Sequence, residues 1–435
     1  MCAHQMMRRQ GRRCSLGTAL SLTAASTPGS RLFWRYWAGS TVSGVGTAVT
    51  SVALPLTAVL VVHASAFSVA AITAAGAMPW LVLGLPAGVY VSRLPLRGVQ
   101  VSMDLLRAAA ILSVPLVAWI GSLSVAQLVA VALIVGAASV PFSVANTTMI
   151  PSIVPPDELT KRNSLTAASR GISQLAGPSL GGLLVDAMGA ASCMLIDAAS
   201  YIVSAVMLWG LPRPATRRDS SERRSVRADI VEGLAFIRQQ PIVRTTFTLS
   251  TCINPLSEAV IALSPTYIVR TLHEPSYVLG FIYAAEGAGA LAGAALAPRL
   301  SKAWGTLGVL RRCVLPVPFA LALLPATFSG WEAALYALGF FGFTATLTVA
   351  AITSLTYQHR MIAPEMLARI QGTTRVVSWG LAPLGALAAG ALTTILGIRG
   401  TLLLVAGASL IIPITAWAML RTVEPPEHPP GSADS

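Results

Sequence analysis

The amino-acid sequence predicts an all-α membrane protein in which twelve transmembrane helices form two parallel repeats of six. Only 11% of the 435 residues are charged and 54% are hydrophobic, whereas about 25% of the residues of a soluble domain are charged. The apolar residues occur in blocks of about 20, the length at which a helix crosses the hydrocarbon core of a bilayer. The second half of the chain also repeats patterns of the first half.

The apolar blocks set the order of the predicted elements. The first six spans are expected near residues 38–62, 67–91, 99–120, 123–148, 164–187 and 190–212. The second six are expected near residues 246–269, 276–297, 307–328, 332–356, 371–396 and 400–420. The chain then divides into a disordered cytoplasmic tail (1–30), an N-terminal six-helix bundle (31–212), a cytoplasmic linker (213–244), a C-terminal six-helix bundle (245–421) and a second cytoplasmic tail (422–435). Within the linker, residues 226–240 are expected to form an amphipathic helix on the inner membrane face.

The formal net charge of +13 is concentrated on one side of the predicted spans. With the N-terminus inside, the linker alone places eight arginines, Arg213 to Arg244, in the cytoplasm, and the opposite side holds only Arg270 and Arg399. This positive-inside bias predicts that both termini are cytoplasmic. The basic charge is thus explained by insertion into the membrane and by contact with anionic lipid, and no nucleic-acid partner is expected. We expect a multi-pass protein of a bacterial cytoplasmic membrane.

The two halves share sequence patterns at matching positions. Residues 155–182 resemble residues 363–390, and each segment has an arginine eight residues before a proline, Arg170 in the first and Arg375 in the second. GLPAGVYVSRL (84–94) likewise resembles GALAGAALAPRL (289–300). Parallel repeats imply a pseudo-twofold axis along the membrane normal, with a substrate site near the midplane between the halves.

Two motifs support a more specific interpretation. Residues 88–97 read Gly-Val-Tyr-Val-Ser-Arg-Leu-Pro-Leu-Arg, and residues 177–182 read Gly-Pro-Ser-Leu-Gly-Gly. With these motifs the chain, from about Phe33 to Arg421, resembles the major facilitator superfamily, and in particular its enterobactin-exporter-like and macrolide-efflux-like branch. The resemblance implies the major facilitator fold and transport of a small molecule by alternating access.

The first motif is similar to the superfamily's cytoplasmic signature, in which arginines latch the halves together through charge-assisted bonds. Ser92 stands where the superfamily has Asp, so the latch is expected to be weaker. The residues assigned to this cytoplasmic gate are Gly88, Ser92, Arg93, Arg97, Asp104, Arg107, Arg170 and Arg375. Two alternatives stay open: Arg93 and Arg97 only follow the positive-inside bias, and Asp104 and Arg107 form a structural pair one helical turn apart.

The second motif, carried by Gly177, Pro178, Gly181 and Gly182, is similar to the Gly-Pro-x-x-Gly-Gly motif of antiporters in the superfamily. The proline kinks its helix and the glycines permit close helix contact, which implies a sealed cavity and export.

Ionisable side chains in the middle of a membrane cost roughly 2.5–3.5 kcal/mol on insertion scales, so each is a functional candidate. Glu258 follows Asn254 by one turn in a span that the resemblance places on the substrate path, and Glu286 lies in the next span. Both carboxylates are candidate proton carriers, and Asn254 and Asn146 are candidate substrate contacts. A structural carboxylate bonded to a neighbouring helix is the alternative for Glu258 and Glu286. It is the preferred interpretation for Asp197.

One departure from the branch concerns the first span, where Thr47 stands at the position of an expected acidic residue. Proton coupling would then depend on Glu258 or Glu286. No catalytic or metal-binding motif is recognisable, so no enzyme activity and no cofactor are expected, and the proton gradient is the expected energy source. We predict a monomeric efflux permease for a lipophilic drug, antibiotic or siderophore-like compound. An uptake permease for a metabolite and a transport-inactive membrane scaffold are the alternatives.

Overall fold

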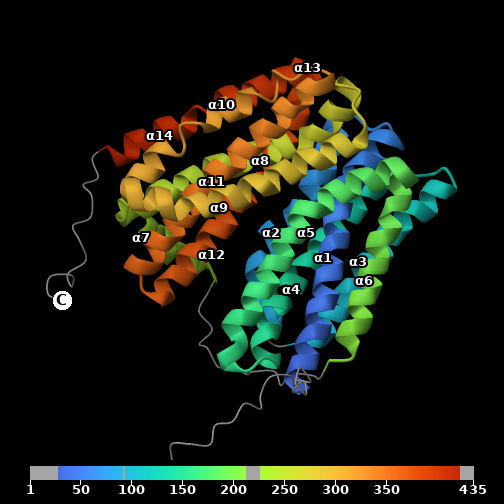
Figure 1. Cartoon of the computed structure of the whole chain (residues 1–435), viewed down its shortest axis with the longest axis horizontal. Helices are drawn as coiled ribbons and strands as arrows, with labels where there is room; N and C mark the ends of the chain where they lie inside the picture. The colour runs from blue at the N-terminus through green and yellow to red at the C-terminus, as the bar shows by residue number, and fades with distance from the viewer. Residues whose placement is uncertain (1–27, 92–93, 212–225, 422–435) are drawn as a thin grey trace, which may run out of the picture.

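The computed structural model describes residues 28–91, 94–211 and 226–421, and its regular elements are helical. The first bundle contains six long helices, drawn blue to green in Figure 1. They are α1 (Pro28–Leu60), α2 (Ala66–Val91), α3 (Leu96–Trp119), α4 (Val125–Ile153), α5 (Leu159–Met188) and α6 (Ala190–Trp209), with the short 3-10 helix η1 (Pro156–Glu158) before α5. Each predicted span of the first half therefore falls within one observed helix or ends within a few residues of it.

The second bundle is drawn yellow to red in Figure 1. It follows α7 (Val226–Gln239) and comprises α8 (Pro241–Thr266), η2 (Tyr267–Thr271), α9 (Ser276–Arg312), α10 (Val317–Ala322), η3 (Gly330–Glu332), α11 (Ala333–Met361), α12 (Pro364–Gly380), α13 (Ala382–Ala408) and α14 (Ile411–Leu420). Two of these elements are not single rods. Gly305 in α9 has φ 64° and Gly397 in α13 has φ 69°, angles outside a right-handed helix that glycine adopts readily. Each glycine thus joins two separate helices.

Among the described residues, nine stretches are long and apolar enough to cross a membrane. One of them, Arg369–Leu420, has 52 residues, too many for a single crossing of about 20 residues, and it contains the turn at Gly397. The 30-residue α5 is not among the nine, since its first turns are polar. The all-α multi-pass fold is confirmed, and the exact count of twelve spans stays a prediction.

The outer surface of the bundles is apolar. Phe319, Ile395 and Trp331 are 74%, 80% and 82% exposed, and many other large apolar side chains share this exposure. A soluble monomer rarely exposes contiguous apolar patches of more than a few hundred Å². The apolar surface is therefore suited to the hydrocarbon of a bilayer.

The most extensive contacts between the bundles are those of α5 with α9 and of α2 with α13. A Cβ at Gly182 of α5 would lie 2.9 Å from the Ser276 carbonyl oxygen of α9, and a Cβ at Gly390 of α13 would lie 2.7 Å from the Ala70 Cβ of α2. The sequence repeat equates the segments in α2 and α9, and those in α5 and α12–α13. The two interfaces are thus equivalent under the pseudo-twofold relation.

Further contacts between the bundles lie at the ends of the helices remote from α7, which we call the far end; the ends near α7 are the linker end. At the far end Arg270, in η2, donates from Nη1 to the Ala64 carbonyl at 2.6 Å and from Nη2 to the Val59 carbonyl at 2.7 Å. Also at the far end, Asp186 of α5 accepts hydrogen bonds from the Ser276 and Tyr277 amides of α9 at 3.2 and 3.1 Å. The bundles are held together at the far end.

The linker helix packs against the second bundle. α7 is present where an amphipathic helix was predicted, and it packs against α12 and α8; its position on the inner membrane face stays a prediction. Its Ile237 is buried in a cluster with Val243 and Ile370, and a Cβ at Gly233 would lie 3.2 Å from the Arg369 carbonyl oxygen. An apolar helix face buries against whatever apolar surface is nearest, and here that surface belongs to the second bundle.

Candidate functional site

The second bundle contains two partly buried carboxylates on neighbouring helices. α8 carries Asn254 and Glu258 one turn apart, and both side chains are intermediate in exposure. The amide nitrogen Nδ2 of Asn254 is buried and has no hydrogen-bond partner among the described residues. The backbone of α13 lies against α8 at this level, because a Cβ at Gly385 would come within 2.0 Å of the Pro255 carbonyl oxygen. The polar stripe of α8 is thus held by a close helix contact.

Glu286 of α9 lies on the side of its helix that faces α8. Tyr283, one turn earlier, donates its hydroxyl to the Ile261 carbonyl of α8 at 3.2 Å. Glu286 follows Tyr283 by one turn and Glu258 precedes Ile261 by one turn, so the two carboxylates flank the same contact between α9 and α8. The structure therefore brings together the two acidic residues that the sequence singled out separately.

These two carboxylates, together with Asn254, form what we call the carboxylate pair site. Neither Glu258 nor Glu286 takes part in a hydrogen bond or a salt bridge within the part of the chain that the structure describes. Two like charges in a poorly solvated place repel each other and each lacks a counter-charge. Such a site favours uptake of a proton or a cationic group.

Asn146 does not belong to this site. It is 6% exposed, and the Tyr36 hydroxyl donates to its backbone carbonyl at 2.9 Å and also to its Oδ1. These bonds tie α4 to α1 inside the first bundle. The side chain of Asn146 thus points to α1, and its predicted contact with substrate stays a prediction.

The structure describes part of the predicted cytoplasmic gate. Ser92 and Arg93 lie outside the described residues, and so do the surroundings of Gly88. Arg97 donates from Nη1 to the Leu211 carbonyl at 2.8 Å and its guanidinium lies 5.6 Å from the Trp209 ring centroid, so it binds the end of α6 in its own bundle. This contact does not join the halves.

The arginines of the two repeat segments differ in their surroundings. Arg375 of α12 places its guanidinium 5.1 Å from the ring centroid of Trp80 on α2, a contact between the bundles. Arg170 of α5 is exposed and interacts electrostatically with Tyr36. Of this predicted pair, the structure therefore gives a cross-bundle contact to Arg375.

Asp104 and Arg107 lie inside the first bundle. Both are buried there, and they form a salt bridge with each other. The Arg107 guanidinium lies 4.0 Å from the Phe142 ring centroid and 4.4 Å from that of Tyr201. The salt bridge is the structural pair that the sequence left open as the alternative to a gate role.

The Gly-Pro-Ser-Leu-Gly-Gly segment lies between α1 and the other bundle. A Cβ at Gly177 would come within 2.3 Å of the Ala48 Cβ, and a Cβ at Gly181 would lie 3.1 Å from the Val49 carbonyl oxygen, both on α1. Gly182 and Pro178 face α9. A Cβ at Gly280 of α9 would lie 2.5 Å from the Pro178 carbonyl oxygen. The motif therefore permits close helix contact on two sides of α5, with α1 on one side and with α9 on the other.

Sequence reasoning did not assign a role to Asp186, Arg270 or Gly280. Asp186 provides an anion at the N-terminus of α9, and Arg270 provides a cation at the C-terminus of α1, which are the favourable ends of the helix dipoles. Each caps a helix of the opposite bundle. The sequence offered one signal, namely that Arg270 is one of only two arginines predicted on the external side.

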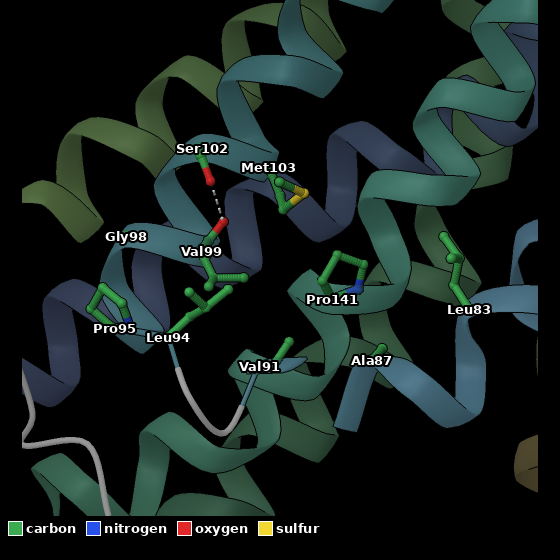
Figure 2. Close-up of a pocket in the computed structure, with 10 residues that line it drawn as sticks. All are labelled: Leu83, Ala87, Val91, Leu94, Pro95, Gly98, Val99, Ser102, Met103 and Pro141. Atoms are coloured by element: carbon green, nitrogen blue, oxygen red, sulfur yellow. Dashed lines mark hydrogen bonds between the residues drawn. The ribbon is translucent and has the colours of Figure 1, made fainter. Parts of the chain in front are cut away.

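A separate apolar cavity of about 410 Å³ lies between α2, α3 and α4. Figure 2 shows Leu83, Ala87 and Val91 of α2 facing residues 94–103 across it, with Pro141 of α4 on a third side. The Ser102 hydroxyl donates to the Val99 carbonyl at 3.0 Å. The described residues that line this cavity carry no charge.

Two helical bundles related by a repeat, with an apolar exterior and ionisable residues inside both bundles, are typical of a multi-pass membrane transporter. Over residues 24–428 the sequence matches the transmembrane secretion effector family. The chain belongs to this family of the major facilitator superfamily.

Related proteins agree with this assignment. The multidrug efflux pump Tap of Mycolicibacterium fortuitum is 27% identical over 394 residues, which cover 88% of this chain and 94% of that protein. Tap of Mycobacterium tuberculosis is 28% identical over 408 residues, 87% of this chain and 90% of that protein. Macrolide efflux protein A of Streptococcus pyogenes is 25% identical over 209 residues, 48% of this chain and 51% of that protein.

Solved structures share the fold. The nucleoside transporter NupG superposes with a TM-score of 0.73 at 12% identity, covering 90% of this chain and 99% of that one. A bacterial homologue of the iron transporter ferroportin in an inward-facing state superposes with a TM-score of 0.69 at 14% identity, covering 89% and 98%. At these identities the likeness concerns the fold alone.

Proposed function

We propose that the protein is a proton-coupled efflux permease that exports lipophilic, cationic small molecules from the cytoplasm by alternating access. The observation that carries the proposal is the carboxylate pair site, in which Glu258 and Glu286 interact with each other and have no cationic partner among the described residues. A proton or a cationic substrate can neutralise this site in turn. The names of the related pumps, multidrug and macrolide efflux proteins, support the direction and the substrate class.

The direction of transport depends on which end faces the cytoplasm. We place the linker end inside, because the arginine-rich linker obeys the positive-inside rule. The cross-bundle bonds of Arg270 and Asp186 then close the external side. In this arrangement the bundles are sealed outside while the carboxylate pair site loads from the cytoplasm. Return to the outward-open state breaks those bonds and admits a proton from outside.

The proposal can be tested in everted membrane vesicles, with ethidium as a cationic probe and erythromycin as a macrolide probe. Acidifying the vesicle lumen should drive both probes into vesicles that contain the protein, and an ionophore that collapses the pH gradient should abolish the accumulation. Vesicles without the protein are the control. Accumulation that ignores the gradient would contradict proton coupling, and probe movement in the opposite direction would identify an uptake permease.

A further inference from the structure

The first bundle encloses a second group of ionisable residues that the proposed function does not use. It consists of Asp104 and Arg107 of α3 and Asp197 of α6, which we call the buried charge cluster. Both aspartates are fully buried and Arg107 nearly so. Arg107 forms a salt bridge with Asp104, and its charge also interacts with that of Asp197. The cluster thus contains two carboxylates and one guanidinium.

The charge count leaves one negative charge without compensation. Within the part of the chain that the structure describes, the other ionisable side chains whose charges interact with the cluster are Tyr201 and Cys193 of α6. Neither side chain carries a positive charge in any protonation state. The Ser200 hydroxyl of α6 donates to Asp197 Oδ1 at 3.0 Å, and the Phe142 ring of α4 lies against the Arg107 guanidinium. The buried hydroxyls of Thr50 and Ser204 have no hydrogen-bond partner among the described residues.

The unbalanced charge coincides with unpaired atoms. The second carboxylate oxygens, Asp104 Oδ2 and Asp197 Oδ2, are buried and have no hydrogen bond of ordinary geometry among the described residues. An isolated ionised carboxylate in such a place is costly, and it becomes neutral by binding a proton. A proton binds to a single carboxylate oxygen. A metal cation bound here would lie beside the Arg107 guanidinium, which also carries a positive charge, so the site favours a proton over a metal cation.

A polar link connects the cluster to a more open surface. The ring centroid of Tyr201 lies 4.4 Å from the Arg107 guanidinium, and the Tyr201 hydroxyl is 2.9 Å from Thr47 Oγ1. Thr47 donates its own proton to the Ser43 carbonyl at 2.9 Å, so the shared hydrogen comes from Tyr201. Thr47 is exposed on α1, and it stands where the sequence comparison expected an acid.

The cluster also touches the helix that the antiporter-like motif packs against. A Cβ at Gly46 would lie 2.5 Å from Asp197 Oδ1 and 2.1 Å from Ser200 Oγ, so the backbone of α1 rests directly on the carboxylate. On another side α1 contacts Gly177 and Gly181 of α5. A change in the charge or hydrogen bonding of Asp197 therefore acts on α1, and through α5 on the interface between the bundles.

We infer that the buried charge cluster is a second proton site. It takes up one proton by way of Thr47 and Tyr201. Its Asp197, on α6, takes the place of the acidic residue that the first span lacks. This inference rests on the proposed proton-coupled transport and adds a coupling site in the other bundle. The proton binds one carboxylate oxygen of the Asp104–Asp197 pair, and the cluster changes from a charge of minus one to neutral.

The test uses the full-length protein in lipid nanodiscs, with Glu258→Gln and Glu286→Gln both present to silence the carboxylate pair site. Infrared difference spectra between alkaline and neutral buffer detect the C=O band of a newly formed carboxylic acid, while exposed carboxylates with ordinary pKa values near 4 stay ionised. The expected result is a band that disappears with Asp197→Asn and also with Asp104→Asn, since either change leaves one carboxylate paired with Arg107. Glu158→Gln at the surface is the matched control and should leave the band unchanged.

Absence of the band in the double-glutamine background would overturn the inference, and so would a band that survives both asparagine variants or that sodium removes. Should an asparagine variant fail to fold, Thr47→Val keeps all three charges and should slow deuterium exchange of the band. Exchange at the parental rate would refute the route through Thr47. If the band persists and Glu258→Gln retains full gradient-driven efflux, the result supports the buried charge cluster as a proton site and refutes the proposed role of Glu258.

Discussion

The close contact between α5 and α9 at Gly280 makes a quantitative prediction. A Cβ at Gly280 would lie 2.5 Å from the Pro178 carbonyl oxygen and 3.1 Å from the Ser179 Cα. Ordinary van der Waals contact begins near 3.4 Å, so Gly280→Ala forces the bundles apart by about 0.9 Å at this point. The obstructing atoms are backbone, and no flexible side chain can move aside. Overpacking of this kind costs typically about 1–3 kcal/mol.

The cost should fall on one conformation only. The contact exists while the bundles are closed at the far end and is lost when they open there, so Gly280→Ala should shift the equilibrium toward the far-end-open state by roughly 5- to 150-fold. The gain in helix propensity from Gly to Ala, about 1 kcal/mol, is common to both states and cancels. Gly171→Ala on α5 is the matched control, because a Cβ there meets nothing within 4 Å.

Distances between spin labels measure this shift. Labels at Ser122 and Trp331, both exposed and in different bundles, report the far end in a variant without native cysteines. Gly280→Ala should increase the fraction of long distances, and Gly171→Ala should match the parent. An unchanged distribution for Gly280→Ala in a folded protein would refute the idea that the bundles separate along the α5–α9 contact.

Three further predictions concern other parts of the structure. Asp186→Ala removes the cap of α9, which is worth typically about 1 kcal/mol, and should raise the far-end-open fraction roughly fivefold in the same label experiment; no change would show that the cap is not a latch. Arg107→Ala leaves the two aspartates without their cation and should lower the free energy of unfolding by about 3–5 kcal/mol, seen as a lower melting temperature in detergent, whereas an unchanged melting temperature would refute the pairing. For topology, a reporter fused after Gly210 should be cytoplasmic and one near His273 external, and the reverse would invert the proposed direction of transport.

The fold was predictable because its signal is local. The helices of the first bundle end within a few residues of the predicted spans at most boundaries, since each span is a long apolar run and its length is set by the bilayer. The start of α1 at Pro28 is earlier than the predicted residue 38, because residues 28–37, in which Arg31 and Arg35 alternate with aromatic side chains, continue the helix beyond the uninterrupted apolar run. The turn at Gly397 also lies between the two predicted spans 371–396 and 400–420.

The candidate site was predictable in part. Glu258 and Glu286 were recognisable because charges in an apolar run are rare, but their mutual approach depends on how α8 and α9 pack. The orientation of the Asn146 side chain could not be predicted from the sequence. Position in the chain indicates which helix carries a residue, whereas the direction of its side chain follows from the neighbours that the helix meets, here Tyr36 of α1.

Contacts between distant segments were beyond the sequence for the same reason. Asp186 and the amide of Ser276 come from different bundles, and nothing in either segment points to the other. The buried charge cluster likewise joins residues from α3 and α6, against the backbone of α1 at Gly46. Its excess charge becomes visible only when the three ionisable side chains are known to share one enclosed space.

The central claim is that Glu258 exchanges a proton for a cationic substrate. The most direct measurement is ethidium efflux from proteoliposomes with an imposed pH gradient, together with ethidium binding to the same purified variants. Glu258→Gln keeps the shape and hydrogen bonding of the side chain but cannot titrate. It should therefore abolish uphill efflux while binding is retained, and Glu286→Gln should have a milder effect. Full gradient-driven efflux by Glu258→Gln with loss in Glu286→Gln would reassign the carboxylate, and full efflux by both variants would contradict the proton-coupled mechanism.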